Sequence, residues 1–542
     1  MSDAGGSSSP LAYHHATKHG FGRFAKSLGY LDWANQPNPF RRFPGAPLTL
    51  LPRRAELRDV PYEALYTNKV PTEAVSPETI AEFLRCALGL SAWKSHGSSR
   101  WALRVNPSSG NLHPTESYLV WDGGVYHYAP DEHALEQRAE LPGTGWPGPR
   151  ADGSGTSACF LVALTSIHWR EAWKYGERAF RYCQHDIGHA VGALRFSAAM
   201  LGWRMTVLPA WSHEDVSSML GLDRAQDFGD AEREEPALIA FVTAAPLDSL
   251  NVDPAPLVEA ARSATWRGHA NRLSPAHTDW PTIEAVALAT VDPGDEPRDP
   301  IAVGSTRYVG TSDSLQARQV VLRRRSAIAF DPRGTLRRET FLSMLERLRP
   351  TAPPWDVLTW QPQAHLALFV HRVQDLQPGI YAYLRSGDGV RDDWGSRMRS
   401  DFLWEHVPAT GSGKDDGLFL LAPLDVRVLA NRLSCDQDIA GDGFFSLGML
   451  ARLAAVREQG PWMYRRLFWE CGLIGQILYL EAEAAGARGT GIGCFYDDPV
   501  HEVLGLQGDE WQSLYHFSMG LPVEDTRLTT EPGYDWERAP TS

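Results

Sequence analysis

Two segments of this 542-residue chain repeat one residue pattern at a constant separation of 284 positions. The repeated positions carry acidic or small residues in both copies, and no gap interrupts them over about forty positions. The matched pairs are Asp186 with Glu470, Gly188 with Gly472, Gly202 with Gly486, and Leu220–Leu222 with Leu504–Leu506. Such agreement at one offset is typical of an internal duplication, so we expect two similar halves in one chain.

Each copy is predicted to contain the same elements in the same order. A strand hairpin comes first, with a turn at Asp122–Gly124 in the first copy, and a long helix, a shorter helix and a closing strand follow. In the second copy, Asp498 is the predicted N-cap of the shorter helix and Pro499 its first residue. The ranges are 116–128 and 366–383 for the hairpins, 177–202 and 463–486 for the long helices, 212–220 and 498–504 for the shorter helices, and 237–242 and 514–519 for the strands. Because strands and helices mix without regular βαβ alternation, the predicted class is α+β.

The repeat also predicts how the chain is divided. The parts are an N-terminal arm at 1–54, a first copy at 55–248, a connector at 249–311, and a second copy at 312–530 with an insertion at about 385–440. The arm carries His14, His15 and His19, which allow a metal site. No other ligand residues gather in the arm, so an arm packed over the core is the favoured interpretation.

The six cysteines are widely scattered and form no CxxC motif, so the sequence predicts neither a metal framework nor a disulfide framework. Free thiols suit a reducing cytoplasm. The first residues lack the pattern of a signal peptide, and no apolar run approaches the roughly 18 residues that span a membrane. We therefore expect a cytoplasmic protein.

The chain has 52 basic and 66 acidic residues, which gives a net charge of −14. A surface with this excess of acidic groups repels nucleic-acid phosphates and anionic membranes, so neither is an expected partner. A phosphate-bearing ligand must then be held by a local basic cluster.

One such cluster is Arg323-Arg324-Arg325-Ser326 in the second copy. Three forked cations and a hydroxyl within four residues suit a phosphate monoester. A solvated basic helix face is the alternative, and spacing alone does not separate the two. The corresponding part of the first copy, Tyr62–Tyr66, has no basic run.

The loop Pro107-Ser108-Ser109-Gly110-Asn111 shows the opposite distribution, because only the first copy has it. Its hydroxyls, amide and accessible backbone suit a planar ring with heteroatoms along its edge, although an ordinary polar loop has the same composition. The second copy has residues 357–363 there and no such turn. Two similar halves behave as a tethered dimer, in which only one of two equivalent interface sites must survive. The two motifs fit one surviving composite site.

The glycines at 489–493 do not indicate a dinucleotide loop, because they follow a helix and not a strand. They belong to one of four motifs that occur together in a known family: Arg324-Arg325-Ser326 with Phe330, Pro107–Asn111, Gly486–Phe495 and Gly520–Arg527. On these motifs the chain resembles the nitroreductase family of flavoenzymes from about residue 55 to 530, and within it the SagB-type dehydrogenases that include azoline oxidases.

The resemblance implies a nitroreductase-like α+β sandwich, formed here as a pseudo-dimer within one chain, with FMN at the interface of the halves. A monomer would then be complete. The implied FMN contacts are Arg324, Arg325 and Ser326 for the phosphate, Pro107, Ser108, Ser109 and Asn111 for the ring and ribityl, Gly491, Ile492 and Gly493 along the ring, and Arg527 as a weaker phosphate contact.

Lys174 and Tyr175 resemble an adjacent pair that handles a proton in the azoline-oxidising branch. The alternative is an exposed pair that caps a helix, and His113, His185 and His189 are alternative acid–bases. The expected function is hydride transfer between FMN and a small or peptidic organic substrate. NAD(P)H-dependent reduction of nitro compounds or quinones and a non-catalytic flavin-binding scaffold remain alternatives. No peptide-clamp module is recognisable, which weakens the case for a peptide.

Overall fold

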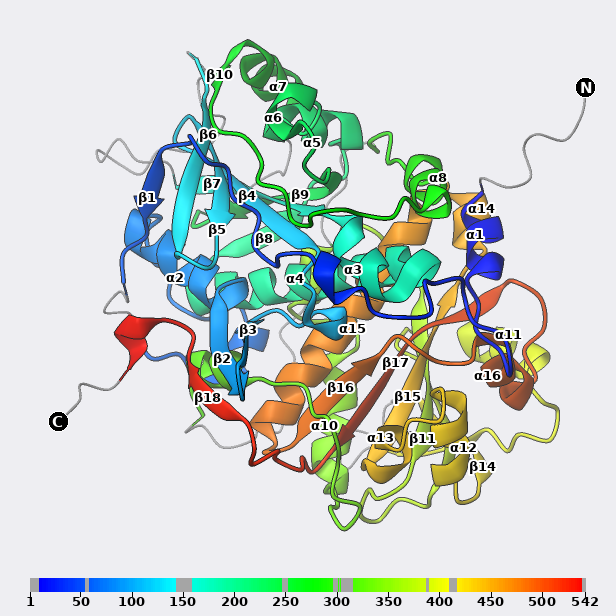
Figure 1. The fold of residues 1–542 in the computed structure, drawn as a ribbon. Helices are drawn as coiled ribbons and strands as arrows, with labels where there is room; N and C mark the ends of the chain where they lie inside the picture. The colour runs from blue at the N-terminus through cyan, green and yellow to red at the C-terminus, as the bar shows by residue number, and fades with distance from the viewer. Residues whose placement is uncertain are drawn as a thin grey trace, which may run out of the picture.

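The computed structural model describes residues 9–53, 58–142, 158–245, 252–295, 301, 303, 315–386, 389–408 and 417–538. Two large sheets lie on either side of two long central helices, with a third, small sheet at one edge (Figure 1). Strands of the first sheet come from the blue to green part of the chain, and those of the second from the yellow to red part.

The first sheet is built of antiparallel neighbours. Across the sheet the strands are β1 (Leu48–Leu50), β6 (Ala134–Glu140), β5 (Gly124–Ala129), β4 (Thr115–Trp121), β7 (Cys159–Ser166), β9 (Glu235–Thr243) and β8 (Arg204–Val207), and β10 (Thr265–Trp266) also pairs with β6. The predicted hairpin is confirmed in β4 and β5. Asp122 and Gly123 join these strands with positive φ angles of 48° and 78°, the conformation of a two-residue type I′ turn.

The second sheet repeats this arrangement. Its strands, again in spatial order, are β13 (Glu405–His406), β14 (Leu418–Pro423), β12 (Gly379–Tyr383), β11 (Ala364–Val370), β15 (Phe445–Arg452), β17 (Trp511–Gly520) and β16 (Arg488–Ile492). In spatial order, β14, β12, β11, β15, β17 and β16 occupy the positions that β6, β5, β4, β7, β9 and β8 occupy in the first sheet. The mixture of helices with antiparallel sheets agrees with the predicted α+β class.

The two long helices, α4 (Ala179–Met200) and α15 (Met463–Ala484), are each 22 residues long and cross at the centre of the molecule (Figure 1). A Cβ atom at Gly188 would collide with the backbone of Trp469, and one at Gly472 with the backbone of His185. Equivalent glycines thus meet each other, as in a two-fold interface. Every residue of α4 is buried, which explains its weak amphipathicity. No described helix combines the length and hydropathy that a membrane crossing requires.

The predicted ends of these helices are confirmed within two residues, with Gly202 and Gly486 at φ angles of 68° and 70° just beyond them. The predicted shorter helices correspond to α5 (His213–Leu220) and α16 (Asp497–Leu504). The prediction that Asp498 is the N-cap and Pro499 the first helical residue is wrong, because the helix begins two residues earlier, at Asp497, with Tyr496 as its N-cap. The Asp497 carboxylate is held by arginines of the first half, so the first turn forms around it.

The arm, the connector and the insertion all contribute regular structure to the two halves. The arm begins with α1 (Pro10–Ala16), which contacts α8 (Pro281–Ala289) of the connector, and it ends in β1. Within the insertion, β14 takes the place of β6, so only part of that segment is additional. The other helices are α2 (Pro77–Ala87), α3 (His168–Tyr175), α6 (Ala225–Phe228), α7 (Pro254–Ser263), α9 (Ala317–Arg323), α10 (Arg338–Arg347), α11 (Val390–Arg397), α12 (Arg427–Leu433), α13 (Ile439–Asp442) and α14 (Ala455–Glu458).

The third sheet joins the C-terminal tail to the first half. In it, β18 (Thr529–Pro532) pairs with β2 (Leu90–His96), which pairs with β3 (Ser99–Arg104). Tyr534 then inserts its buried hydroxyl, which donates to the Pro130 carbonyl at 2.7 Å and accepts from the Leu90 amide at 3.0 Å. The tail of the second half is therefore fixed to the first half.

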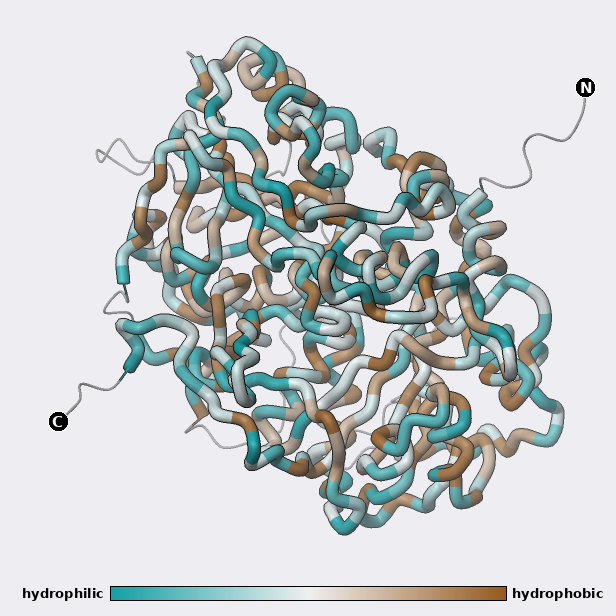
Figure 2. Tube along the Cα trace, viewed as in Figure 1, coloured by the Kyte–Doolittle hydropathy of each residue, from teal (hydrophilic) through white to brown (hydrophobic). Residues whose placement is uncertain are grey.

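Apolar and polar stretches alternate along both halves (Figure 2). The largest apolar cluster contains residues of both halves, among them Phe160 and Leu368, so the halves share one core. Two smaller clusters cover the outer faces of the first and second sheets. Each sheet is thus covered on both faces, and the long helices lie in the shared core.

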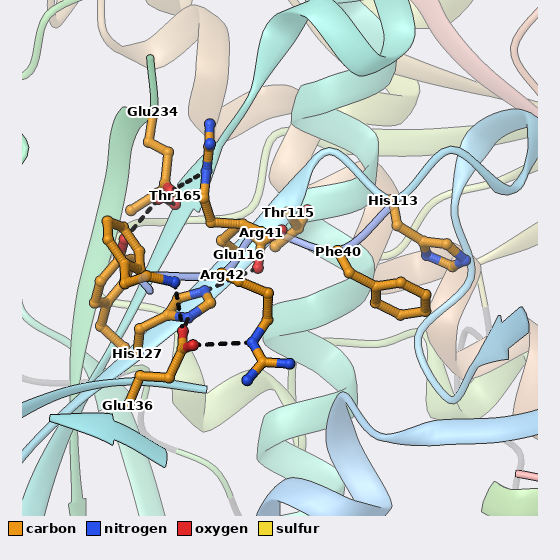
Figure 3. Close-up of polar contacts among 12 residues, drawn as sticks. Phe40, Arg41, Arg42, His113, Thr115, Glu116, His127, Glu136, Thr165 and Glu234 are labelled. Atoms are coloured by element: carbon orange, nitrogen blue, oxygen red, sulfur yellow. Dashed lines mark hydrogen bonds and ion pairs between the residues drawn. The ribbon is translucent and has the colours of Figure 1, made fainter. Parts of the chain in front are cut away.

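A buried polar network fastens the arm to the first sheet (Figure 3). The His127 ring lies between two carboxylates, with Nδ1 2.8 Å from Glu136 and Nε2 3.1 Å from Glu116. Arg42 of the arm donates to Glu136 at 2.9 Å. Burial alone would lower the pKa of His127, but hydrogen bonds with the two carboxylates raise the pKa to about 9. The imidazole is therefore charged at neutral pH.

We expect His127→Gln to lower the melting temperature, because the change removes a cation that lies between two buried carboxylates. Within the described chain, Glu116 and Glu136 then keep only their pairs with Arg170 and Arg42, and breaking a buried ion pair costs about 3–5 kcal/mol. The raised pKa of His127 adds stability below about pH 6.5 that disappears as the pH rises through about 9. The difference in melting temperature between the wild type and His127→Gln should therefore shrink between these pH values. The difference between the wild type and His277→Gln, an exposed control, should shrink less. An equal difference in melting temperature at both ends of the range would contradict the charged imidazole.

Candidate functional site

A cavity of about 400 Å³ lies between the two halves. The first half contributes the loop that precedes β4, and the second half contributes the segment after α9, strand β16 and the C-terminal tail. Residues singled out from the sequence that line it are Pro107, Ser108, Ser109, Asn111, Arg324, Arg325, Ser326 and Gly491, together with two of the alternative acid–bases, His113 and His189. Motifs more than 200 positions apart in the sequence thus share one cavity.

The loop of the first half is held rigidly by its own side chains. The Ser108 hydroxyl accepts the His113 amide at 2.8 Å, and Nε2 of His113 lies 2.9 Å from the Asn111 amide oxygen. Gly110, Asn111 and His113 all have φ angles between 53° and 59°. Two non-glycine residues in the left-handed region carry a strain of about 1–3 kcal/mol each, so the surrounding contacts must hold this shape in place.

Arg324 and Arg325 project from the end of α9 toward the first half. Within the described chain, the hydrogen bonds of both guanidinium groups go to backbone carbonyl oxygens, such as those of Arg104 and Val105. Nη1 of Arg324 is buried and has no hydrogen-bond partner among the described residues. Burial lowers the pKa of both groups, to about 9 for Arg325, where the charge of Arg324 adds to the effect. A buried cation next to a half-buried one favours a bound anion.

Cations outnumber acidic groups around the cavity. The cationic lining residues are Lys94, Arg104, Arg324, Arg325 and Arg488, and the acidic ones are Asp186, Glu524 and Asp525. One of the cations is already neutralised, because Arg488 pairs with Glu524 at 2.7 Å. The remaining surplus of positive charge lies around Arg324 and Arg325, despite the negative net charge of the chain.

The glycine-rich strand β16 forms one wall. The Gly491 amide donates to the Tyr479 hydroxyl at 2.8 Å, and the Ser326 hydroxyl lies 3.0 Å from that oxygen. Gly491 has no room for a Cβ, which would collide with the Tyr515 hydroxyl. The flat backbone of this strand therefore faces the cavity together with Ser326.

Two residues of the same motif lie elsewhere. Ile492 packs in the apolar cluster behind the second sheet, because successive residues of a strand face opposite sides. Gly493 packs against the Tyr182 ring, and its carbonyl accepts from Arg178 at 3.1 Å. Neither residue lines the cavity.

Arg527 also lies away from the cavity wall. Its side chain is 75% exposed and pairs with Asp525 at 2.7 Å. The neighbouring tail residues Val523, Glu524, Asp525 and Leu528 do line the cavity. The tail thus faces the cavity with residues that the sequence did not single out.

Lys174 and Tyr175 end helix α3 beside the loop of the first half. A Cβ added at Gly110 would lie 2.6 Å from the Tyr175 hydroxyl and 3.1 Å from Nζ of Lys174. The Tyr175 ring makes an edge contact with Tyr182 at 4.6 Å. Burial and the charge of Glu171 raise the pKa of Tyr175 well above its usual value, so the hydroxyl stays protonated at neutral pH. The pair therefore contacts the cavity loop from outside.

Asp186 is a cavity residue to which the sequence assigned no chemistry. Its carboxylate accepts the backbone amide of Ser109 at 3.1 Å and the hydroxyl of the same residue at 3.2 Å. Burial raises its pKa to about 7. Glu171 is completely buried nearby, and burial together with the charge of Asp186 raises its pKa well above the usual range. The only signal in the sequence was the pairing of Asp186 with Glu470.

The matching position in the second half has a different environment. Glu470 accepts the backbone amides of Gln363 and Ala364 at 2.7 and 3.1 Å, so it fixes the loop before β11 as Asp186 fixes the loop before β4. Glu470, however, is paired with the buried Arg385. Asp186 has no such ion pair within the described chain, so no cation there opposes the effect of burial on its pKa.

The corresponding interface on the opposite side is filled. The offset of 284 pairs Tyr479 with Arg195, which binds Asp356 at 2.7 Å. It also pairs Arg488 with Arg204, beside which a hollow of only about 20 Å³ remains. The two interfaces are therefore unequal, and the large cavity is on one side.

Residues 70–229 match the sequence model of the nitroreductase family. A crystal structure described as a nitroreductase from Anabaena variabilis is similar to this chain, with a TM-score of 0.66 and 20% identity. The match covers 95% of this chain and 99% of the other. This match shows that most of the chain has the fold of that protein, with mixed helices and sheets.

Two other structures match smaller parts. A nitroreductase structure from Ralstonia eutropha covers 39% of this chain and 95% of its own, with a TM-score of 0.27 and 16% identity. The E. coli microcin synthetase McbBCD complex with truncated pro-MccB17 covers 36% of this chain and 71% of the other, with a TM-score of 0.25 and 21% identity. No curated protein matches the sequence.

We expect Asp186→Asn to raise the melting temperature at about pH 8, because the folded protein no longer holds a buried charged carboxylate. The pKa of Asp186 rises from 3.8 to about 7 on folding, so its favourable contribution is present below pH 3.8 and is lost as the pH rises through about 7. The gain should shrink by roughly 1.4 kcal/mol for each pH unit between about 7 and 5. Asp279→Asn, an exposed control, should change little, and a gain of equal size at both pH values would contradict the raised pKa.

Proposed function

We propose that this protein is an FMN-dependent oxidoreductase that transfers hydride between FMN and a small or peptidic organic substrate. We also propose that its halves are diverged copies that form a pseudo-dimer around one FMN site. The observation that carries the proposal is the cavity itself, which joins the basic segment of one half to the polar loop of the other. The equal helix lengths and the glycine crossing support the duplication.

The buried Arg324 and the half-buried Arg325 fit the phosphate of FMN. Arg324 keeps one nitrogen without a partner among the described residues, and its other hydrogen bonds go to neutral carbonyl oxygens. A buried cation in this state is stabilised by an anion, and a guanidinium matches the geometry of phosphate oxygens. Arg325 and Ser326 lie beside it on the same wall.

The rest of the cavity fits a flat, heteroatom-edged ring. Nδ1 of His113 and the amide oxygen of Asn106 are buried lining atoms without partners in the described part of the chain. Ser108, Ser109 and Asn111 contribute further polar groups, and Gly491 gives a wall without a side chain. These features are the ones that an isoalloxazine and its ribityl chain require.

When bound, FMN would supply a centre that accepts or releases two electrons as hydride. The protein's residues would then manage the accompanying proton. Tyr175 keeps its hydroxyl proton at neutral pH because its pKa is raised by burial, so it suits the role of a proton donor. Asp186 titrates near neutral pH and suits the role of a proton acceptor. Lys174 and Tyr175 beside the cavity loop also support our proposal that the chain is related to the SagB-type dehydrogenases.

We expect the wild-type protein to release about one FMN per chain on denaturation, because one of its two interfaces holds the large cavity. Arg324→Ala should lower FMN affinity by about tenfold or more, since a charge-assisted contact contributes roughly 1.5–3 kcal/mol. Arg323→Ala, which changes an exposed arginine of the same run, should bind FMN as the wild type does. Two FMN per chain would contradict a single composite site, and unchanged affinity in Arg324→Ala would contradict the phosphate contact.

We expect the double variant Lys174→Ala, Tyr175→Phe to retain FMN but to be reduced by a C–H-donating organic substrate about 10²–10⁴ times more slowly, the scale of lost acid–base catalysis. The measurement is the anaerobic bleaching of the flavin, with Lys69→Ala, Tyr30→Phe as an exposed control pair. Loss of FMN would assign the pair to cofactor binding. An unchanged rate would leave the two residues as a helix cap, with Asp186 as the next residue to test.

A further inference from the structure

His19, Cys435 and Cys494 meet at one point outside the cavity. Their potential ligand atoms all lie within 4.8 Å of one another. Sγ of Cys494 is 3.7 Å from Nδ1 of His19 and 2.8 Å from Sγ of Cys435. The sequence predicted no metal framework, because these residues are separated by 475 and 59 positions. The prediction rested on residues that are neighbours along the chain, whereas the fold brings together three residues from distant segments.

The backbone holds His19 in this place independently of the sulfur atoms. Its amide donates to the Asp497 carboxylate at 2.8 Å, and its carbonyl accepts the Asp497 amide at 3.0 Å. The Asp497 carboxylate is itself buried and pairs with Arg178 and Arg181 at 2.9 and 2.8 Å. His19 is thus fixed at the start of α16 by a charged cluster that joins both halves.

The two cysteine loops are also held together without their thiols. The Gln437 side chain donates to the Cys494 carbonyl at 3.0 Å, and the Tyr496 amide donates to the Leu433 carbonyl at 2.9 Å. Cys435 and the next residue both have φ angles near 57°. Consecutive left-handed residues that are not glycine are unfavourable, so this loop keeps a strained shape that presents the Cys435 thiol to its partners.

These two cysteines differ from the other four. Cys86, Cys159, Cys183 and Cys471 are buried, whereas Cys435 and Cys494 are partly exposed. A metal ion or water can therefore reach the pair. His19 is 7% exposed, and its imidazole lies against the Phe24 ring, with centroids 4.9 Å apart. The site is open on the side of the thiols and closed on the side of the histidine.

We propose that His19, Cys435 and Cys494 bind one Zn²⁺ ion, with a fourth position open to water. Two sulfurs and one imidazole nitrogen are a preferred donor set of zinc, which binds them at about 2.3 and 2.0–2.1 Å in a tetrahedral arrangement. That arrangement places the donors roughly 3.5–3.8 Å apart, close to the distance between His19 and Cys494. The two sulfur atoms must separate by about one ångström to complete it.

A disulfide between Cys435 and Cys494 is the competing outcome. It would require the sulfurs to approach to about 2.05 Å, and it would leave His19 without a role. The third donor, fixed by its own backbone contacts, favours the metal. The ion would connect the N-terminal arm, the loop between α12 and α13, and the segment after β16. Gly491, a residue of β16 itself, lines the cavity.

The test is to measure zinc in the purified full-length, FMN-loaded protein by elemental analysis, and then to titrate zinc into protein dialysed against a chelator. We expect about one zinc ion per chain in the wild-type protein. The affinity for zinc should be about tenfold or more weaker in His19→Asn, Cys435→Ser and Cys494→Ser, since the loss of even a supporting contact weakens metal binding on this scale. His15→Asn, a change four residues earlier in the same arm, should bind zinc normally. Circular dichroism melting checks that each variant is folded.

Cobalt substitution reports the ligands directly. Co²⁺ in the wild-type protein should give strong d–d bands to the red of the flavin absorption, as tetrahedral sites with thiolate ligands do, and Cys435→Ser should lose them. Zinc binding that survives in all three ligand variants would overturn the proposal. So would wild-type protein that binds no zinc, and a Cys435–Cys494 disulfide found in the mass of the unreduced chain would then identify the competing outcome.

Discussion

The close crossing of α4 and α15 is the contact on which the rest of the structure depends. Gly188 and Gly472 lack side chains, so the two backbones touch where any Cβ would force them apart. Asp186 and Glu470 each precede one of these glycines by two residues, and each fixes the loop that leads into its own sheet. The distance between the helices therefore sets the distance between the two loops, and with it the width of the interface on both sides.

Charge compensation makes the two interfaces different. In the second half Arg385 neutralises the buried Glu470, while Asp186 of the first half is left with a raised pKa at the cavity wall. Arg324 shows the opposite imbalance, since it is a buried cation bound to neutral carbonyl oxygens. Buried charges without partners are costly, and they occur here on the side with the large cavity. A ligand with an anionic group would supply the counter-charge that Arg324 lacks, which is the physical basis of the proposed FMN site.

The two ends of the described chain hold the halves together. The arm runs from His19 at the second half to Arg42 at the first sheet, and the tail runs back from the second sheet to pair with β2. Each of these two segments packs against both halves, so neither half has a complete core of its own. The zinc site that we propose lies where the arm meets the segment after β16.

The sequence by itself predicted the repeated elements and the class, because periodicity, caps and turn residues act between near neighbours. It also identified Arg324 and Ser109 as candidate site residues, since their motifs are local. Tertiary structure decided what depends on long-range contacts: that Ile492 faces the outer core, that Asp186 has no cationic partner among the described residues, and that Cys494 lies beside side chains from distant segments. Burial and charge pairing arise only when separate segments pack, and no pattern along the chain encodes them.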